Sequence, residues 1–144
     1  KANVKLVAMA DACKARIDRF TKLQGWPSVV ALKPPKDASP WAFGKQAASL
    51  AYYLQAAFIL EGLRTLAPLD RERQFFVVAI EKSAPHGVRV FRFDEEALEQ
   101  GEREIRRYLA TYKICLESNV WPGYADTIDS LALPKYALDP EVIE

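Results

Sequence analysis

The sequence predicts a mixed α/β domain built around one sheet, and three patterns support that prediction. Short apolar runs typical of strands come first, a capped helical stripe follows, and a hairpin-like pair of runs then leads into a second helical stripe. The chain has 144 residues, half of them hydrophobic, which suffices for one core and is too short for two. We therefore expect a single domain over residues 1–144, with residues 119–144 forming a tail that packs on it.

Three runs before the first helix are expected to be strands. Residues 4–9 are apolar and rich in β-formers, and residues 13–23 carry apolar side chains at alternate positions. Residues 28–33 form a short apolar run of the kind found in buried strands. Pro34 and Pro35 end that strand, because neither proline can donate a hydrogen bond to a neighbouring strand.

A long core helix is expected next. Ser39 can cap its N-terminus, and Pro40 fits the first turn, where a missing N–H costs nothing. Apolar residues then recur at helical spacing, namely Phe43, Ala47, Leu50, Leu54, Ala57 and Phe58. Gly62 weakens the end of this pattern, so we predict one continuous helix from Pro40 to that region.

The second half of the chain predicts a hairpin and another helix. Residues 74–82 and 88–93 are expected to be strands, joined by the turn sequence Ser-Ala-Pro-His-Gly at 83–87. Asp94 can cap the helix that follows, and the two glutamates after it suit the positive end of a helix. The apolar stripe predicted for this helix consists of Leu98, Ile105, Leu109, Tyr112 and Leu116.

The composition restricts the classes of function. The formal net charge is +1, from 20 basic and 19 acidic residues, so any surface for nucleic acid has to be local. No apolar run approaches the roughly 18 residues of a membrane span, and the N-terminus lacks the layout of a signal peptide. Cys13 and Cys115 match no metal or redox spacing and are expected to be reduced thiols. We expect a soluble, cytoplasmic protein that does not engage a membrane.

Several short motifs follow one another in a specific order. They are Lys14, Arg16 and Asp18, then Ala-Leu-Lys-Pro-Pro-Lys-Asp-Ala-Ser-Pro at 31–40, then Tyr52, Gln55, Ala56 and Ala57, then Glu81 and Lys82, and finally Cys115, Trp-Pro-Gly-Tyr at 121–124, Leu133 and Pro134. In these motifs the chain resembles the PD-(D/E)xK-like C-terminal domain of exodeoxyribonuclease VIII and its phage and prophage relatives. The resemblance runs from about Cys13 to about Tyr136, which is nearly the whole chain.

This resemblance implies a restriction-endonuclease-like α/β fold with a Mg²⁺-dependent nuclease site. In the family, an acid on one strand and an acid two residues before a lysine on the next strand hold the cation, whose preferred ligands are oxygens. The lysine orients or activates water, or stabilises charge at the scissile phosphate. Asp18 and Lys33 match two of these positions, but Ala31 stands at the second acid position, and a methyl group cannot ligate a cation. Asp18 is thus left as a weak metal ligand, and Mg²⁺ is implied only if the chain is active.

The resemblance also assigns a polar pair on the first helix. The family's Tyr-x-x-Gln corresponds to Tyr52 and Gln55 and faces the active site. Because the strand period places residues 31 and 33 on one face, we expect Asp18, Lys33 and Gln55 to converge on one shallow site. The alternative for Gln55 is an ordinary polar residue at the margin of an apolar helix.

Further departures bear on catalysis. Pro34-Pro35 replaces the family's paired threonines, and Ile59 replaces a tyrosine. The chain is also expected to start after a helical region that supplies another metal ligand in the family. His86 falls in the predicted turn and is expected to be solvated rather than catalytic.

Basic residues near the expected site are candidates for binding DNA. They are Lys14, Arg16, Arg19, Lys36 and Lys45, with scattered solvated charges as the alternative. Trp121 and Tyr124 are expected to tuck against the sheet in a tight turn, with base stacking as the alternative.

Three classes of function stay open. The first is a catalytically impaired phage or prophage exonuclease-like protein, retained for binding double-stranded DNA or a host nucleic-acid-processing or defence complex. The second is a Mg²⁺-dependent 5′–3′ double-strand DNA exonuclease domain, seen as a fragment or an active-site variant. The third is a decayed remnant or stabilising subunit of a larger nuclease. An oligomer is compatible with each of them.

Overall fold

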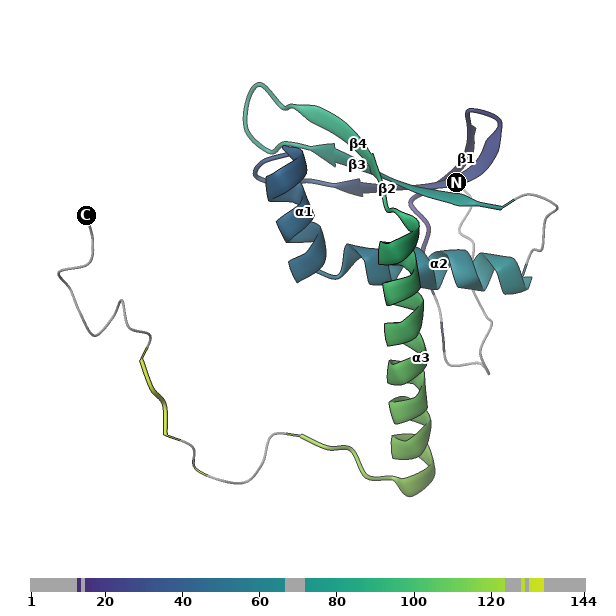
Figure 1. Cartoon of the computed structure of the whole chain (residues 1–144), viewed down its shortest axis with the longest axis vertical. Helices are drawn as coiled ribbons and strands as arrows, with labels where there is room; N and C mark the ends of the chain where they lie inside the picture. Colours follow the sequence, from purple (N-terminus) through teal and green to yellow (C-terminus); the bar gives the residue numbers. More distant parts are fainter. Residues whose placement is uncertain (1–12, 14, 67–71, 124–127, 129, 134–144) are drawn as a thin grey trace. The chain divides into compact units, whose positions relative to one another are not determined.

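The computed structural model describes residues 13, 15–66, 72–123, 128 and 130–133. The chain forms two compact units, Lys1–Tyr112 and Lys113–Glu144. The first unit holds a four-stranded sheet and two helices, α1 (Pro40–Ser49) and α2 (Tyr52–Leu66), as Figure 1 shows. A third helix, α3 (Glu95–Ser118), begins in the first unit and ends in the second. The strand expected at 4–9 lies outside the described residues.

The sheet is mixed. It contains β1 (Arg19–Leu23), β2 (Trp26–Lys33), β3 (Gln74–Ile80) and β4 (Val88–Arg92), in the spatial order β1-β2-β3-β4. β1 and β2 are antiparallel, β2 and β3 are parallel, and β3 and β4 form the predicted antiparallel hairpin. Two parallel strands need a crossover connection, and the connection between β2 and β3 contains α1 and α2. These observations confirm the predicted α/β class, a mixed sheet flanked by helices.

The first described strand is shorter than predicted. The strand expected over 13–23 begins only at Arg19, although Ile17 before it is 4% exposed and belongs to the core. A two-residue turn, Gln24–Gly25, joins β1 to β2, with φ angles of 50° and 80°. Positive φ at both turn residues gives the twist that suits a tight hairpin. This turn lets β2 begin at Trp26 rather than at residue 28.

The single long helix predicted after Ser39 is wrong. α1 ends at Ser49, and α2 begins at Tyr52, directly after Ala51 with its φ of +50°. No glycine or proline marks this break, and Leu50, expected in the core, is 57% exposed. Figure 1 shows that α1 and α2 run in different directions, so each can bury its own apolar side against the sheet. One straight helix cannot do this, and packing therefore overrides the local preference for a continuous helix.

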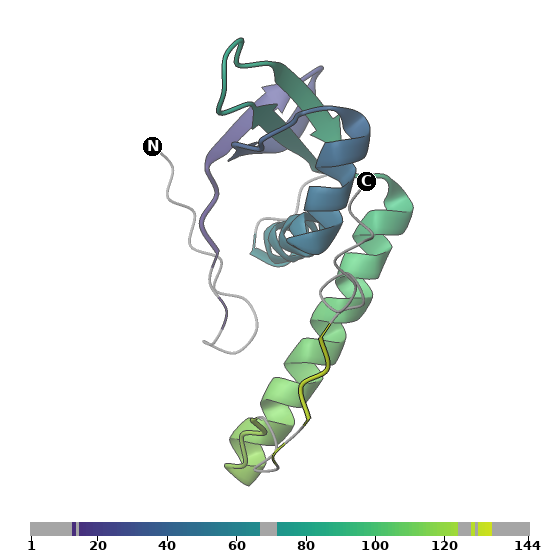
Figure 2. The same cartoon turned by 90° about the vertical axis from the view of Figure 1, so that its left-hand side faces the viewer.

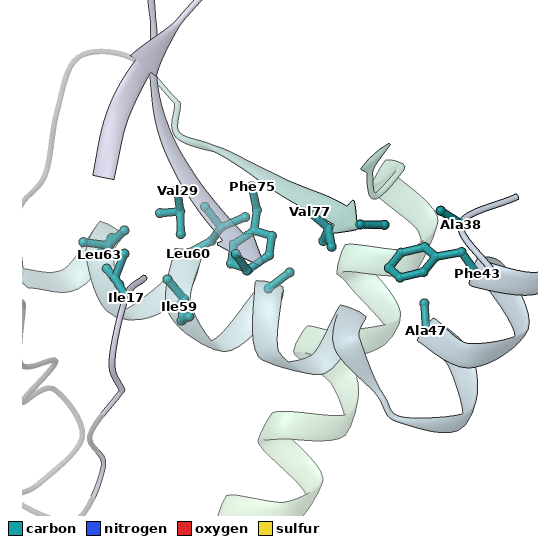
Figure 3. Close-up of a cluster of buried hydrophobic side chains, with 13 residues drawn as sticks. Ile17, Val29, Ala38, Phe43, Ala47, Ile59, Leu60, Leu63, Phe75 and Val77 are labelled. Atoms are coloured by element: carbon teal, nitrogen blue, oxygen red, sulfur yellow. The ribbon is translucent and has the colours of Figure 1, made fainter. Parts of the chain in front are cut away.

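α1 and α2 cover one face of the sheet, as Figures 1 and 2 show from two sides. Alternate residues of β2 and β3 point to this face, where they meet the apolar sides of the helices (Figure 3). The buried cluster consists of Ile17, Val29, Ala31, Ala38, Phe43, Ala47, Ala56, Ile59, Leu60, Leu63, Phe75, Val77 and Ala79. Phe43 also stacks on Phe91 of β4, with ring centroids 4.7 Å apart.

The opposite face of the sheet is apolar as well. Alternation turns seven apolar side chains to this outer face, together with Arg19 and Arg92, and the apolar ones are Val30, Leu32, Phe76, Val78, Ile80, Val88 and Val90. Leu32 and Val90 are each 57% exposed, and Val88 is 63% exposed. The register places Leu32, Val78 and Val90 side by side on three strands. A parallel strand pair is usually covered on both faces, so an open apolar face of this kind is unusual.

α3 begins where the sequence predicts. The Asp94 carboxylate accepts a hydrogen bond of 2.9 Å from the amide three residues on, as a helix cap does. Gly101 lies close to α2, because a Cβ atom there would be 2.8 Å from the Cβ of Ala57. The Tyr53 hydroxyl donates to Glu104 at 2.9 Å, and this hydrogen bond raises the pKa of Tyr53. Two neighbouring contacts thus connect α2 with α3.

The apolar stripe predicted for α3 is only partly buried. Ile105 is 8% exposed, whereas Tyr112 is 43% and Leu116 60% exposed, because helical spacing alone does not provide a packing partner. In the second unit Trp121 is 55% exposed, and Tyr124 lies outside the described residues. None of the helices in the described part of the chain is long and apolar enough to cross a membrane.

Candidate functional site

Lys33, the last residue of β2, contacts the first turn of α2. Its Nζ donates a hydrogen bond of 2.8 Å to Oε1 of Gln55. The same Nζ lies 4.3 Å from the ring centroid of Tyr52, within the range of a cation–π contact. The predicted meeting of Lys33 with Gln55 is therefore present, with Tyr52 as a third member.

The break between the two helices positions these residues. Since α2 begins at Tyr52, both Tyr52 and Gln55 lie in its first turn, next to the end of β2. Gln46 of α1 donates from Nε2 to the Tyr52 hydroxyl at 3.1 Å, and the Phe43 ring lies 6.0 Å from the Tyr52 ring. Gln46 was missed by the sequence reasoning. Its only signal is its place three residues after Phe43, on an adjoining part of the same helix surface.

Asp18 lies beside β2, just before β1 begins. The register pairs Arg19 with Val30, so Asp18 directly precedes the first paired residue of β1. Oδ2 of Asp18 accepts a hydrogen bond of 3.3 Å from the backbone amide of Leu32. The carboxylate thus satisfies a β2 amide at the point where strand pairing stops. Asp18 already has a structural role at this place.

The donor set at this site does not fit a resident Mg²⁺ ion. Ala31, at the position where the sequence comparison with the nuclease family expected a second acid, is 3% exposed and shares the inner face of β2 with Val29 and Lys33. Neither β1 nor β2 contains an acid, Asp18 lies just before β1, and Lys33 is a cation. Among the described residues, no group of three or more His, Cys, Asp or Glu side chains could hold a metal ion. Magnesium prefers several oxygen ligands, which this arrangement does not supply.

Two other polar residues have local structural contacts. Glu81, directly after β3, accepts a hydrogen bond of 2.8 Å from the Ala38 amide and so holds the segment before α1. Nδ1 of His86 lies 3.1 Å from the Glu81 carbonyl oxygen within the β3–β4 turn. His86 is exposed and has a φ of 57°, which matches its predicted place in a turn.

The basic residues predicted to bind DNA do not all lie on one face. Arg19 pairs with Val30, so strand alternation turns it toward the outer face, away from Lys33. Arg16, Lys36 and Lys45 are exposed, and Lys14 lies outside the described residues. Asp37 lies between Lys36 and Lys45 in the sequence. The hydrogen bond with the Ser39 backbone is the main cause that holds the pKa of Asp37 below its usual range, and a hydrogen bond with the Ser39 side chain adds to it. The Asp37 carboxylate therefore stays ionised.

A protein family described as "PDDEXK-like domain of unknown function (DUF3799)" matches residues 6–134 of the sequence. The chain belongs to this PDDEXK-like family. None of the curated proteins compared with it matches. Among solved structures, the chain is similar to a "putative exonuclease" from Eubacterium rectale, with a TM-score of 0.59 and 14% sequence identity. The match covers 87% of this chain and 50% of that one, so the PDDEXK-like chain spans about half the length of its structural relative.

Family and fold agree with the geometry of the site. The mixed sheet, the crossover through α1 and α2, and a lysine at the end of the second described strand suit a PDDEXK-like nuclease fold. At 14% identity, the similarity to the bacterial structure concerns the fold alone. The PDDEXK-like chain is therefore nuclease-like in family and in fold.

Proposed function

We propose that the chain is a phage or prophage exonuclease-like protein of the exodeoxyribonuclease VIII type that has lost metal-dependent cleavage and is retained for binding DNA. The observation that carries this proposal is Ala31, a buried methyl group at the place where the site requires a carboxylate. Asp18, the remaining acid, accepts a hydrogen bond from the Leu32 amide. With one carboxylate, Mg²⁺ is expected to bind in the millimolar range or more weakly, because it is usually held by carboxylates together with substrate phosphates.

Loss of cleavage does not remove the means to hold a phosphate. Lys33 is oriented by Gln55 and Tyr52, and neither partner neutralises its charge. Residues 33–45 contain three lysines and one acid, so this stretch is locally basic in a chain of net charge +1. Contacts of lysine with phosphate do not depend on base sequence and weaken as salt rises. We therefore assign DNA binding to the end of β2 and to α1.

A protein partner is the second candidate, and the outer face of the sheet favours it. Leu32, Val88 and Val90 are each more than half exposed on this face. Large open apolar surfaces commonly mark contact with another protein. A host nucleic-acid-processing or defence complex would be such a partner.

The test combines cleavage and binding on the whole chain. A labelled linear duplex should stay intact with Mg²⁺ or Mn²⁺ while fluorescence anisotropy reports its binding. Lys33→Ala should weaken binding about tenfold and lower the salt slope by about one, as expected for one lost phosphate contact. Lys22→Ala, which removes an exposed lysine near the β1–β2 turn, is the matched control and should bind like the wild type.

Two results would contradict the proposal. Metal-dependent digestion that Asp18→Ala abolishes would show an active exonuclease, the alternative drawn from the family. Absence of DNA binding by the wild type would instead favour the protein partner.

A further inference from the structure

Trp41 is exposed although it lies on a helix that packs well on its other side. The side chain belongs to the first turn of α1 and is 73% exposed, more than any other aromatic residue in the described part of the chain. Nζ of Lys45, one turn further along, lies 3.6 Å from the indole ring centroid. A tryptophan has a large apolar surface, so most are substantially buried.

The helix geometry explains the position of this pair. α1 buries Phe43 and Ala47 against the sheet. At about 100° per residue, Trp41 lies roughly 160° around the helix from Phe43, almost opposite the buried side. Lys45 covers one face of the indole, and the exposure of Trp41 leaves much of the ring open to solvent.

α1 is firmly anchored and connected to the Lys33 site. Phe43 stacks on Phe91 at 4.7 Å, and Ser39 caps the helix by accepting a hydrogen bond from the Ala42 amide. Gln46, next to Lys45 in sequence, bonds to the hydroxyl of the same Tyr52 whose ring lies under Lys33. α1 therefore carries an aromatic ring and a cation, and through Gln46 the same helix contacts the Lys33 site assigned to phosphate binding.

We propose that Trp41 and Lys45 form a binding site for an unpaired nucleotide at a DNA end. The base stacks on the open part of the indole, and the Lys45 ammonium pairs with an adjoining phosphate. Stacking of this kind tolerates any base, because every base has a π-face. Bases inside a duplex are not accessible for it, so the site would favour ends with a single-stranded extension. This inference rests on the proposed DNA binding and adds the form of DNA that is selected.

The test uses the full chain and two labelled duplexes, one blunt and one with a short oligothymidine extension, at either the 5′ or the 3′ end. The wild type should prefer an extended duplex. Trp41→Ala should weaken binding of that duplex about tenfold, within the range for one stacked base, and change blunt-duplex binding less than twofold. Trp41→Phe should keep most of the preference, whereas Lys33→Ala should weaken binding of both duplexes.

Tyr108 provides a matched control. It is also an exposed aromatic residue on a helix, with Cζ of Arg107 5.0 Å from its ring centroid. Oε2 of Glu104 lies 3.5 Å from the Tyr108 hydroxyl, and this carboxylate would repel a phosphate. Tyr108→Ala should therefore bind both duplexes like the wild type.

The outcomes separate the two proposals. A wild type that binds both duplexes equally, or a folded Trp41→Ala variant that keeps the preference, would overturn the stacking site and leave DNA binding in place. A wild type that binds neither duplex would overturn both. Circular dichroism of each variant checks that it is folded.

Discussion

Ala31 lies on a strand, β2, that contributes both to the hydrophobic core and to the candidate site. Its side chain is 3% exposed in the cluster that contains Val29 and Val77. Two residues further on, Lys33 leaves that cluster and reaches Gln55. An acid at position 31 would stand next to Leu32, whose amide binds Asp18, but it would also place a charge at the margin of the core. Alanine at this position favours packing over metal binding.

Ala31→Asp tests this balance. Without metal, the variant should lose about 1–3 kcal/mol of unfolding free energy, because a poorly solvated carboxylate is placed near a second one. Added Mg²⁺ should restore stability if the two acids bind it, by about 2.7 kcal/mol at one hundred times the dissociation constant. Urea denaturation with and without Mg²⁺ measures both effects.

Ala31→Asn is the control, since it has nearly the same size and polarity but no charge. It should be destabilised and should gain nothing from Mg²⁺. If Ala31→Asp also gains nothing at tens of millimolar Mg²⁺, the carboxylates at positions 18 and 31 do not share a cation.

At the level of elements, the contact between α2 and α3 depends on one glycine. A Cβ atom at Gly101 would lie 2.8 Å from the Cβ of Ala57 and 2.9 Å from the backbone oxygen of Tyr53. The backbone atom cannot move without shifting α2. The close approach of the two helices therefore requires the absence of a side chain at this position.

Gly101→Ala should destabilise the protein despite the better helix propensity of alanine. Overpacking costs about 1–3 kcal/mol, whereas the propensity gain is about 1 kcal/mol, so a net loss is expected. Gly44→Ala in α1 is the matched control, because a Cβ there meets nothing within 4 Å. That variant should gain about 0.4–1 kcal/mol. A thermal melt that shows Gly101→Ala as stable as Gly44→Ala would contradict the close contact.

The elements also show which parts of the fold can be predicted from sequence. The two helix starts at Ser39 and Asp94 follow from side chains that bond to amides three residues on, which is a local effect. The break at Ala51 has no such signal, because its left-handed φ is compatible with alanine only when packing on both sides imposes it. The alternating pattern similarly predicted too early a start for the first strand, because Ile17 is buried although it precedes β1 and is not paired in the sheet.

The candidate site was predictable where its residues end or begin an element. Lys33 ends β2 and Gln55 lies in the first turn of α2, so the family's order of motifs indicated their contact. Gln46 and Trp41 were not found, because neither belongs to a motif and their contacts arise only from the orientation of α1. The hydrogen bond that Asp18 accepts from the Leu32 amide likewise depends on where strand pairing stops.

At the scale of the whole molecule, the two faces of the sheet differ in how far their apolar side chains are covered. The inner face of the sheet is covered by α1 and α2, whereas the outer face leaves Leu32, Val88 and Val90 each more than half exposed. The chain also spans about half the length of the similar exonuclease-like structure. Apolar residues on both faces are typical of a sheet that is covered on both faces.

The outer face has a practical consequence for handling the protein. Dyes such as ANS fluoresce on exposed hydrophobic surface and usually report loss of packing. Here the folded protein should give a high signal before any heating, so a dye-monitored melt would resemble that of a partly unfolded sample. Replacing Leu32 and Val90 with threonine should lower the initial signal and improve solubility while the melting temperature measured by circular dichroism stays within a few degrees. An unchanged dye signal would mean that these side chains are covered in solution.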